Sequence, residues 1–184
     1  MNLPLVSLRE ALRRPEYFGA VLAGDSWANW RVLLVAIAGE GLDEAEAGAF
    51  KGLSGRTGAP TEAAREFWAV VGRRGGKSRA AAVLAAWLAA CKDYRHILAP
   101  GERGQLQVLS ATRDQAGNLF NFVSGIFEAS RALSGLVESM LIGMNDMTQD
   151  VLHRRACHQR ITTNMGLWGF CGVTVSSSHP GSPL

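Results

Sequence analysis

The loop from residue 72 to residue 78, Gly-Arg-Arg-Gly-Gly-Lys-Ser, combines residue types that bind phosphate groups. Glycines let backbone N–H groups turn inward around phosphate oxygens, a lysine contacts the β and γ phosphates, and a hydroxyl ligates Mg²⁺. Gly76, Lys77 and Ser78 match the end of the general pattern G-x-x-x-x-G-K-[ST]. The first position of that pattern falls on Val71, one residue before Gly72, so the match is partial.

The segments on either side of this loop favour phosphate binding over a simple glycine-rich turn, although G-K-[ST] alone often arises by chance. Residues 67–71 (FWAVV) form a short aromatic and β-branched run that is typical of a buried strand. From Ser78 to about Ala90 the chain is apolar on every side, which predicts a buried helix. A strand before the loop and a helix after it are the context that the motif requires, so we expect nucleotide binding here.

Three helix patterns occupy the amino-terminal third of the chain. Ser7 and Glu10 form an S-x-x-E capping box that begins the first. The second is an apolar run between residues 25 and 39, where Asp25 or Ser26 serves as N-cap and a glycine ends the helix, and the third spans residues 43–53. We therefore expect residues 1–60 to form a helical amino-terminal segment.

A second strand and helix follow the loop. The stretch QLQVLSA, residues 105–111, predicts a strand, and Thr112 is a candidate N-cap for the next helix. One face of that helix is apolar at three-and-four spacing: Ala116, Leu119, Phe120, Val123 and Phe127. Strand, helix, strand, helix predicts an α/β fold: a P-loop NTPase-type parallel sheet flanked by helices, with residues 61–138 as its partial core.

Composition bounds the class of protein. The 184 residues are 47% hydrophobic, enough for one domain with a core, and the net charge of +3 permits a polyanionic partner without requiring one. The longest apolar run, residues 80–90, is too short to span a bilayer, and the first residues lack a signal-peptide core. We expect a cytoplasmic protein with no membrane partner.

Three stretches in order also resemble a known family. They are SWANWRVLLVAIAGEGL, GRRGGKSRAA and YRHILAPGERGQLQVLSATRDQAGNLF, within roughly residues 18–137. They look like the ATPase half of phage terminase large subunits, the motors that package DNA into viral capsids. Terminase loops have the form R-x-x-G-K-[ST], which accounts for the late Gly72. The resemblance implies ATP and Mg²⁺ as cofactors, and double-stranded DNA, the portal protein and the small terminase subunit as partners in the bacterial host cytoplasm.

The resemblance also implies roles for individual residues. Lys77 would contact the phosphates, Ser78 the metal, and Arg73 the γ-phosphate during hydrolysis, so Lys77 and Arg73 are the candidate catalytic residues. The rest of the cofactor-binding loop is Gly72, Arg74, Gly75 and Gly76, of which Arg74 has no clear family role. Trp27 and Trp30 fall where the family builds part of its adenine pocket, although tryptophans at this spacing are more often core residues.

The segment 139–184 departs from the family pattern. Terminases take their Mg²⁺-binding and water-orienting carboxylates from an apolar strand that ends in Asp-Glu, whereas Asp146 and Asp150 follow no such strand. The nuclease domain is also absent. The segment is enriched in otherwise rare residues: Met140, Met144, Met147, Met165, Cys157, Cys171, His153, His158 and His179. A shift of reading frame near Glu138 would produce this change, and a genuine but divergent tail is the competing hypothesis.

Three further interpretations concern chemistry. His153, Cys157, His158 and Cys171 lack the paired spacing of a zinc site, and we interpret them as accidental. Without the acidic motif we expect weak Mg-ATP binding and turnover near background. The alternatives to a terminase fragment are another phosphate-loop ATPase, such as a helicase, and a non-enzymatic remnant or regulatory fragment.

Overall fold

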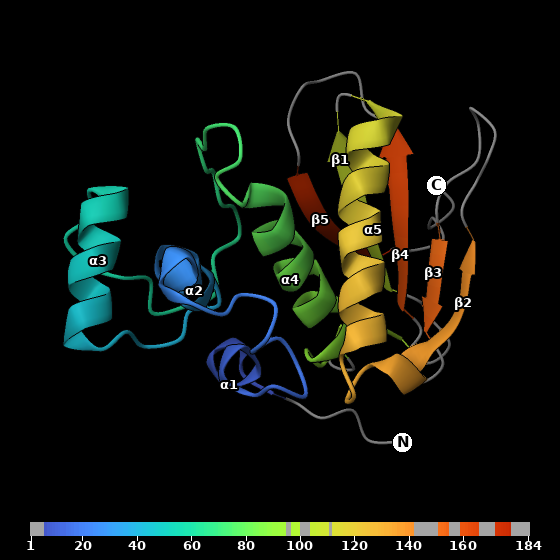
Figure 1. The fold of residues 1–184 in the computed structure, drawn as a ribbon, viewed down its shortest axis with the longest axis horizontal. Coiled ribbons are helices and arrows are strands. Elements are labelled where there is room, and N and C mark those ends of the chain that lie inside the picture. Colours follow the sequence, from blue (N-terminus) through green and yellow to red (C-terminus); the bar gives the residue numbers. More distant parts are fainter. Residues whose placement is uncertain are drawn as a thin grey trace, which may run out of the picture.

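The computed structural model describes the backbone in seven stretches, residues 6–94, 97–99, 104–110, 112–141, 151–154, 159–165 and 172–177. Side chains are described for most of these residues up to Val137 and for none beyond it. Five α-helices and five strands lie in these stretches (Figure 1).

The three amino-terminal helices form where local signals place them. Helix α1 spans Leu8–Arg13, and the Ser7 hydroxyl accepts a hydrogen bond from the Glu10 N–H, as the capping box predicts. A 3-10 turn, η1 (Asp25–Trp27), leads into α2 (Ala28–Ile37). Helix α3 (Glu44–Ser54) begins with a complete capping box formed by Asp43 and Glu46. The three expected helices are present, each within a few residues of its predicted bounds.

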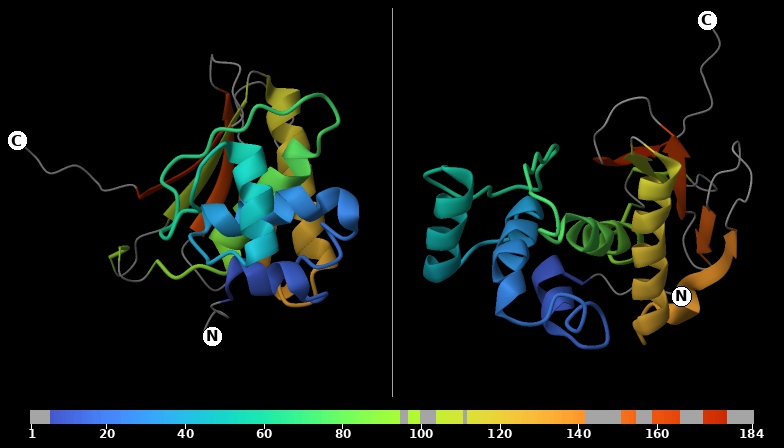
Figure 2. Two further views of the ribbon diagram at one scale, coloured as in Figure 1. Left: turned by 90° about the vertical axis from the view of Figure 1, so that its left-hand side faces the viewer. Right: turned by 45° about the horizontal axis from the view of Figure 1, so that its top comes forward.

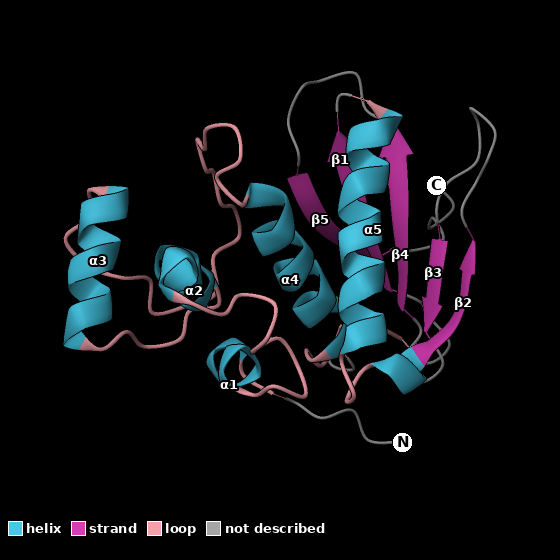
Figure 3. Ribbon diagram, in the orientation of Figure 1, coloured by secondary structure: helices cyan, strands magenta, loops and turns pink. Residues whose placement is uncertain are grey.

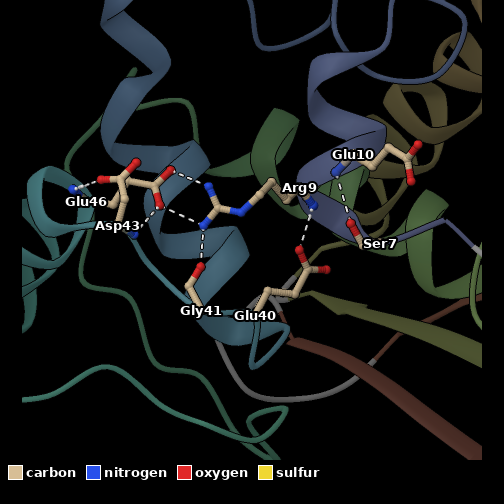
Figure 4. Close-up of polar contacts among 7 residues, drawn as sticks. All are labelled: Ser7, Arg9, Glu10, Glu40, Gly41, Asp43 and Glu46. Carbon is tan, nitrogen blue, oxygen red and sulfur yellow. Dashed lines mark hydrogen bonds and ion pairs between the residues drawn. The ribbon is translucent and has the colours of Figure 1, made fainter.

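Arg9 joins α1 to the beginning of α3 (Figure 4). Its guanidinium makes two 2.7 Å hydrogen bonds to the Glu46 carboxylate and a third bond to the Gly41 carbonyl. The Arg9 bond lowers the pKa of the Glu46 carboxyl because it stabilises the charged form. Glu40 accepts bonds from the backbone N–H groups of Leu8 and Arg9, so an acid caps the positive end of α1.

Two longer helices carry most of the core. Helix α4 (Lys77–Ala90) buries residues around most of its circumference, and α5 (Arg113–Ala129) is capped by Thr112. The buried face of α5 is the predicted one, and it also includes Ile126. The many alanines of α4 bring the two helices close, and they pack against each other.

The strand predicted at residues 67–71 is wrong. This segment has no regular secondary structure, and its side chains are largely exposed: 43% for Phe67, 73% for Trp68 and the whole of Val70. A strand forms only where a neighbouring strand satisfies its backbone groups. No described strand pairs with this segment: β1 (Gly104–Ser110), for example, lies between two other strands.

The predicted P-loop NTPase-type parallel sheet is therefore also wrong. Residues 6–136 are mostly helical: their described part holds five α-helices and one strand, β1, which has no partner strand within this range. The partners of β1 come from the carboxyl-terminal segment, where the sequence predicted no strands. Four strands lie there: β2 (Val137–Leu141, after a 3-10 turn at Ser134–Leu136), β3 (Val151–Arg154), β4 (Gln159–Met165) and β5 (Gly172–Ser177).

The backbone order of these strands is β2-β3-β4-β1-β5. Only β1 and β4 run parallel, and the other three pairs are antiparallel. In the parallel pair Gly104 lies opposite Gln159 and Ser110 opposite Met165. The strands pair in both directions, and the arrangement lacks the successive parallel strands with helical crossovers that the sequence predicted.

The elements follow one another along the long axis of the molecule, from α3 at one end to the strands at the other (Figure 1). Helix α5 packs against β1 and β4, α4 lies beside it, and α1–α3 extend beyond α4, with α3 farthest from the strands (Figures 1 and 2). The loop that enters α4 lies between α2 and the upper end of α5 (Figure 3). Among the described helices, none has the length and apolar character needed to cross a bilayer.

Candidate functional site

The predicted phosphate loop is a tight turn that runs directly into α4. The Gly75 N–H donates to the Gly72 carbonyl at 3.2 Å, and Gly76 is the N-cap of α4 with a left-handed backbone (φ +79°). Arg74 also has a positive φ, 62°, and is the only described residue other than glycine to do so. Two left-handed residues within three positions turn the chain sharply at the start of the helix.

The amino terminus of α4 has no side-chain cap. The first N–H groups of a helix lack intrahelical acceptors, and together they carry the positive end of the helix dipole. Gly76 supplies no side-chain oxygen to satisfy them, in contrast to Ser7, Asp43 and Thr112 at three other helices. Such a terminus is suited to an anionic oxygen from a ligand.

Positive side chains surround this terminus. Arg73, Arg74, Lys77 and Arg79 are all exposed, and Ser78 is half-buried. The ion pairs of the described side chains lie in the amino-terminal helices, and none of them includes a cation of this loop. Four neighbouring cations repel one another, and an anion would reduce that repulsion.

Two tryptophans hold the loop from the side of α2. The indole Nε1–H of Trp30 donates a 2.8 Å hydrogen bond to the Gly75 carbonyl. The ring of Trp27 lies so close to Gly76 that a Cβ there would be 2.6 Å from its Cζ3 atom. Glycine is therefore required at residue 76 for both its backbone angle and its close approach to a ring. The structure brings Trp27 and Trp30 into direct contact with the glycines of the loop.

Arg79 is a residue of this region that sequence reasoning missed. Its guanidinium carbon lies 5.4 Å from the centroid of the Trp27 ring and 5.9 Å from that of Phe122 on α5. One signal could have drawn attention to it. A cation in the first turn of a helix is unfavourable because it faces the positive end of the dipole, so its presence there calls for a compensating contact.

The acidic, histidine and cysteine residues of the segment 139–184 have no described side chains. Asp146, Asp150, Cys157, His158 and Cys171 lie outside the described residues, and His153 is described only by its backbone, in β3. Among the residues described, no three His, Cys, Asp or Glu side chains form a group that could hold a metal ion.

Because residues 67–71 form no strand, the loop is supported differently from the prediction. A phosphate loop predicted between a strand and a helix instead follows an exposed segment without regular secondary structure. Its position is set by α4, Trp27 and Trp30.

Comparisons with models of protein families, with curated proteins and with solved structures gave no match.

Proposed function

We propose that this chain binds Mg-ATP at residues 72–78 as the nucleotide-binding part of a terminase-type motor for viral DNA packaging. The observation that supports nucleotide binding best is the uncapped amino terminus of α4, reached through a glycine-rich turn and flanked by exposed cations. Helix termini of this kind accommodate phosphate oxygens through backbone N–H groups. The assignment to packaging motors rests on the sequence resemblance.

Three polar residues of the loop have proposed tasks. Lys77, the first residue of α4, contacts the β and γ phosphates as a point charge, and the Ser78 hydroxyl ligates Mg²⁺. Arg73 stabilises the negative charge that develops on the γ-phosphate during transfer. Double-stranded DNA, the portal protein and the small terminase subunit are the proposed partners.

Nucleotide binding without hydrolysis is a second candidate function. It is favoured by the exposed segment before the loop, where Trp68 and Val70 project into solvent. Hydrolysis requires the phosphates and the attacking water to be held within fractions of an ångström, whereas binding tolerates a looser loop. A regulatory or remnant role would need only the binding step.

A titration of the purified chain with Mg-ATP, followed by calorimetry, tests the proposal. Lys77→Ala should weaken binding by roughly tenfold or more, because a hydrogen bond to a charged group contributes about 1.5–3 kcal/mol. Lys51→Ala, which removes an exposed lysine from α3, is the matched control and should leave the affinity unchanged. Equal affinities for Lys77→Ala and the unaltered chain would show that the loop assignment is wrong.

The packaging assignment has its own test. Addition of a capsid portal with double-stranded DNA should stimulate any residual ATP hydrolysis more than single-stranded nucleic acid does. The reverse order of stimulation would favour a helicase-like ATPase over a packaging motor.

A further inference from the structure

Arg79 occupies a position that opposes its own charge. It is the third residue of α4, near the positive end of the helix and close in sequence to Arg73, Arg74 and Lys77. A cation in the first turn of a helix is unfavourable because it faces the positive end of the helix dipole. Some other contact must therefore offset this cost.

Two aromatic rings from different elements supply that contact. Trp27 belongs to η1 and Phe122 to α5, and the Arg79 guanidinium lies within cation–π distance of both, at 5.4 and 5.9 Å. The arrangement also accounts for Phe122, which is 40% exposed although most apolar side chains of α5 are buried.

The aromatic contacts of Arg79 extend to the phosphate loop through Trp27. The Trp27 ring that Arg79 contacts also abuts Gly76, and Trp30, one helical turn along the chain, donates its indole N–H to Gly75. A shift of the Trp27 ring would therefore release the side of the loop that carries these two glycines.

We propose that Arg79 is a positioning residue, whose charge holds Trp27 and Phe122 together and so fixes the phosphate loop against α2. Its consequence for ligand binding rests on the proposed function, but its effect on the loop does not. We call the contacts of Arg79 with Trp27 and Phe122 the clamp, and it depends on the positive charge of residue 79. Simple packing by the arginine stem would depend only on its length.

The Trp30 indole N–H gives a direct readout of the clamp in the unliganded chain. Its ¹H–¹⁵N signal is identified by its loss in Trp30→Phe, and its rate of exchange with solvent reports the bond to Gly75. Arg79→Met should raise that rate roughly two- to fivefold, the factor expected for one exposed cation–π contact. Phe122→Leu should have a similar effect, and Arg79→Lys should restore most of the protection because it keeps the charge.

Two results would overturn the proposal. One is an unchanged Trp30 exchange rate in both Arg79→Met and Phe122→Leu. The other is an equal increase in Arg79→Met and Arg79→Lys, which would assign the effect to packing and not to charge. If Arg79→Met fails to fold, Phe122→Leu is compared with Phe122→Tyr, which keeps a ring. A faster Trp30 exchange in Phe122→Leu alone supports the clamp, and equal exchange rates in the two variants overturn it.

Mg-ATP titrations of the same variants separate this inference from the proposed function. If the unaltered chain binds Mg-ATP, Arg79→Met should lower the affinity roughly two- to fivefold and Arg79→Lys should restore it. A chain whose Trp30 exchange responds to Arg79→Met but which binds no nucleotide would retain the clamp and lose the proposed function. If nucleotide binding depends on Lys77 but the Trp30 exchange rate is unchanged in Arg79→Met, the proposed function stands and the clamp is overturned.

Discussion

The indole N–H of Trp30 donates a 2.8 Å hydrogen bond to the carbonyl of Gly75, which lies 45 residues later in the sequence. This bond joins α2 to the loop that enters α4, and the Trp27 ring adds a close contact with Gly76. The loop therefore depends on a tertiary contact for its position, because no strand supports it from the preceding segment.

Gly76→Ala should destabilise the fold by about 1–3 kcal/mol, because an alanine would need a left-handed backbone and its Cβ would collide with the Trp27 ring. Gly72→Ala is the matched control, since a Cβ there has no neighbour within 4 Å, and its effect should stay within about 0.5 kcal/mol. Urea denaturation measures both free energies of unfolding. Equal effects of the two substitutions would contradict the described contact between the loop and Trp27.

Val70→Asp should leave the free energy of unfolding unchanged to within about 0.5 kcal/mol, because Val70 is fully exposed. The comparison is Val108→Asp in β1, where the side chain is fully buried and an unpaired carboxylate should cost about 4 kcal/mol or more. Chemical denaturation followed by circular dichroism distinguishes the two. A large loss of stability in Val70→Asp would place residues 67–71 in the core after all.

Glu46→Gln should make the chain less sensitive to acid. The bond to Arg9 lowers the pKa of the Glu46 carboxyl, so the folded state holds the charged form more strongly than the unfolded state does. The resulting stability is fully present above the unfolded-state pKa, about 4.3, and is lost as the pH falls through the lower folded-state value. Glutamine can still complete the capping box with Asp43, so the substitution removes mainly the charge.

Denaturation midpoints between pH 2 and pH 7 measure this effect. The difference between Glu46→Gln and the unaltered chain should be about 1 kcal/mol at neutral pH, since both partners are partly exposed, and should vanish at the acid end. Glu44→Gln, also in the first turn of α3, is the matched control for replacing a glutamate by glutamine. A difference that grows toward low pH would have the wrong sign for a depressed carboxyl pKa.

Purified chain should hydrolyse ATP at a rate near background, because the sequence holds no apolar strand that ends in Asp-Glu and could supply a magnesium-binding acid. Phosphate release measured with and without Mg²⁺ checks this expectation, with Lys77→Ala as the inactive reference. Robust turnover that Lys77→Ala abolishes would mean that the acids come from residues not recognised as such.

The amino-acid sequence by itself determined the helices and their caps. The Ser7 cap, the Thr112 cap and the apolar face of α5 are encoded by residues within a few positions of one another, and all three are present. Local hydrogen bonds and periodic burial need no knowledge of distant segments. For the same reason the glycine-rich loop and the helix after it could be placed by sequence alone.

Only the tertiary structure decided what lies beside these elements. Residues 67–71 have the composition of a strand, yet they pair with none of the described strands, and the segment remains largely exposed. The contacts of Arg79 with Trp27 and Phe122 join residues that are tens of positions apart. Strand pairing and aromatic stacking depend on which distant surfaces meet. Composition and spacing describe what each segment could do, but they do not specify its partner.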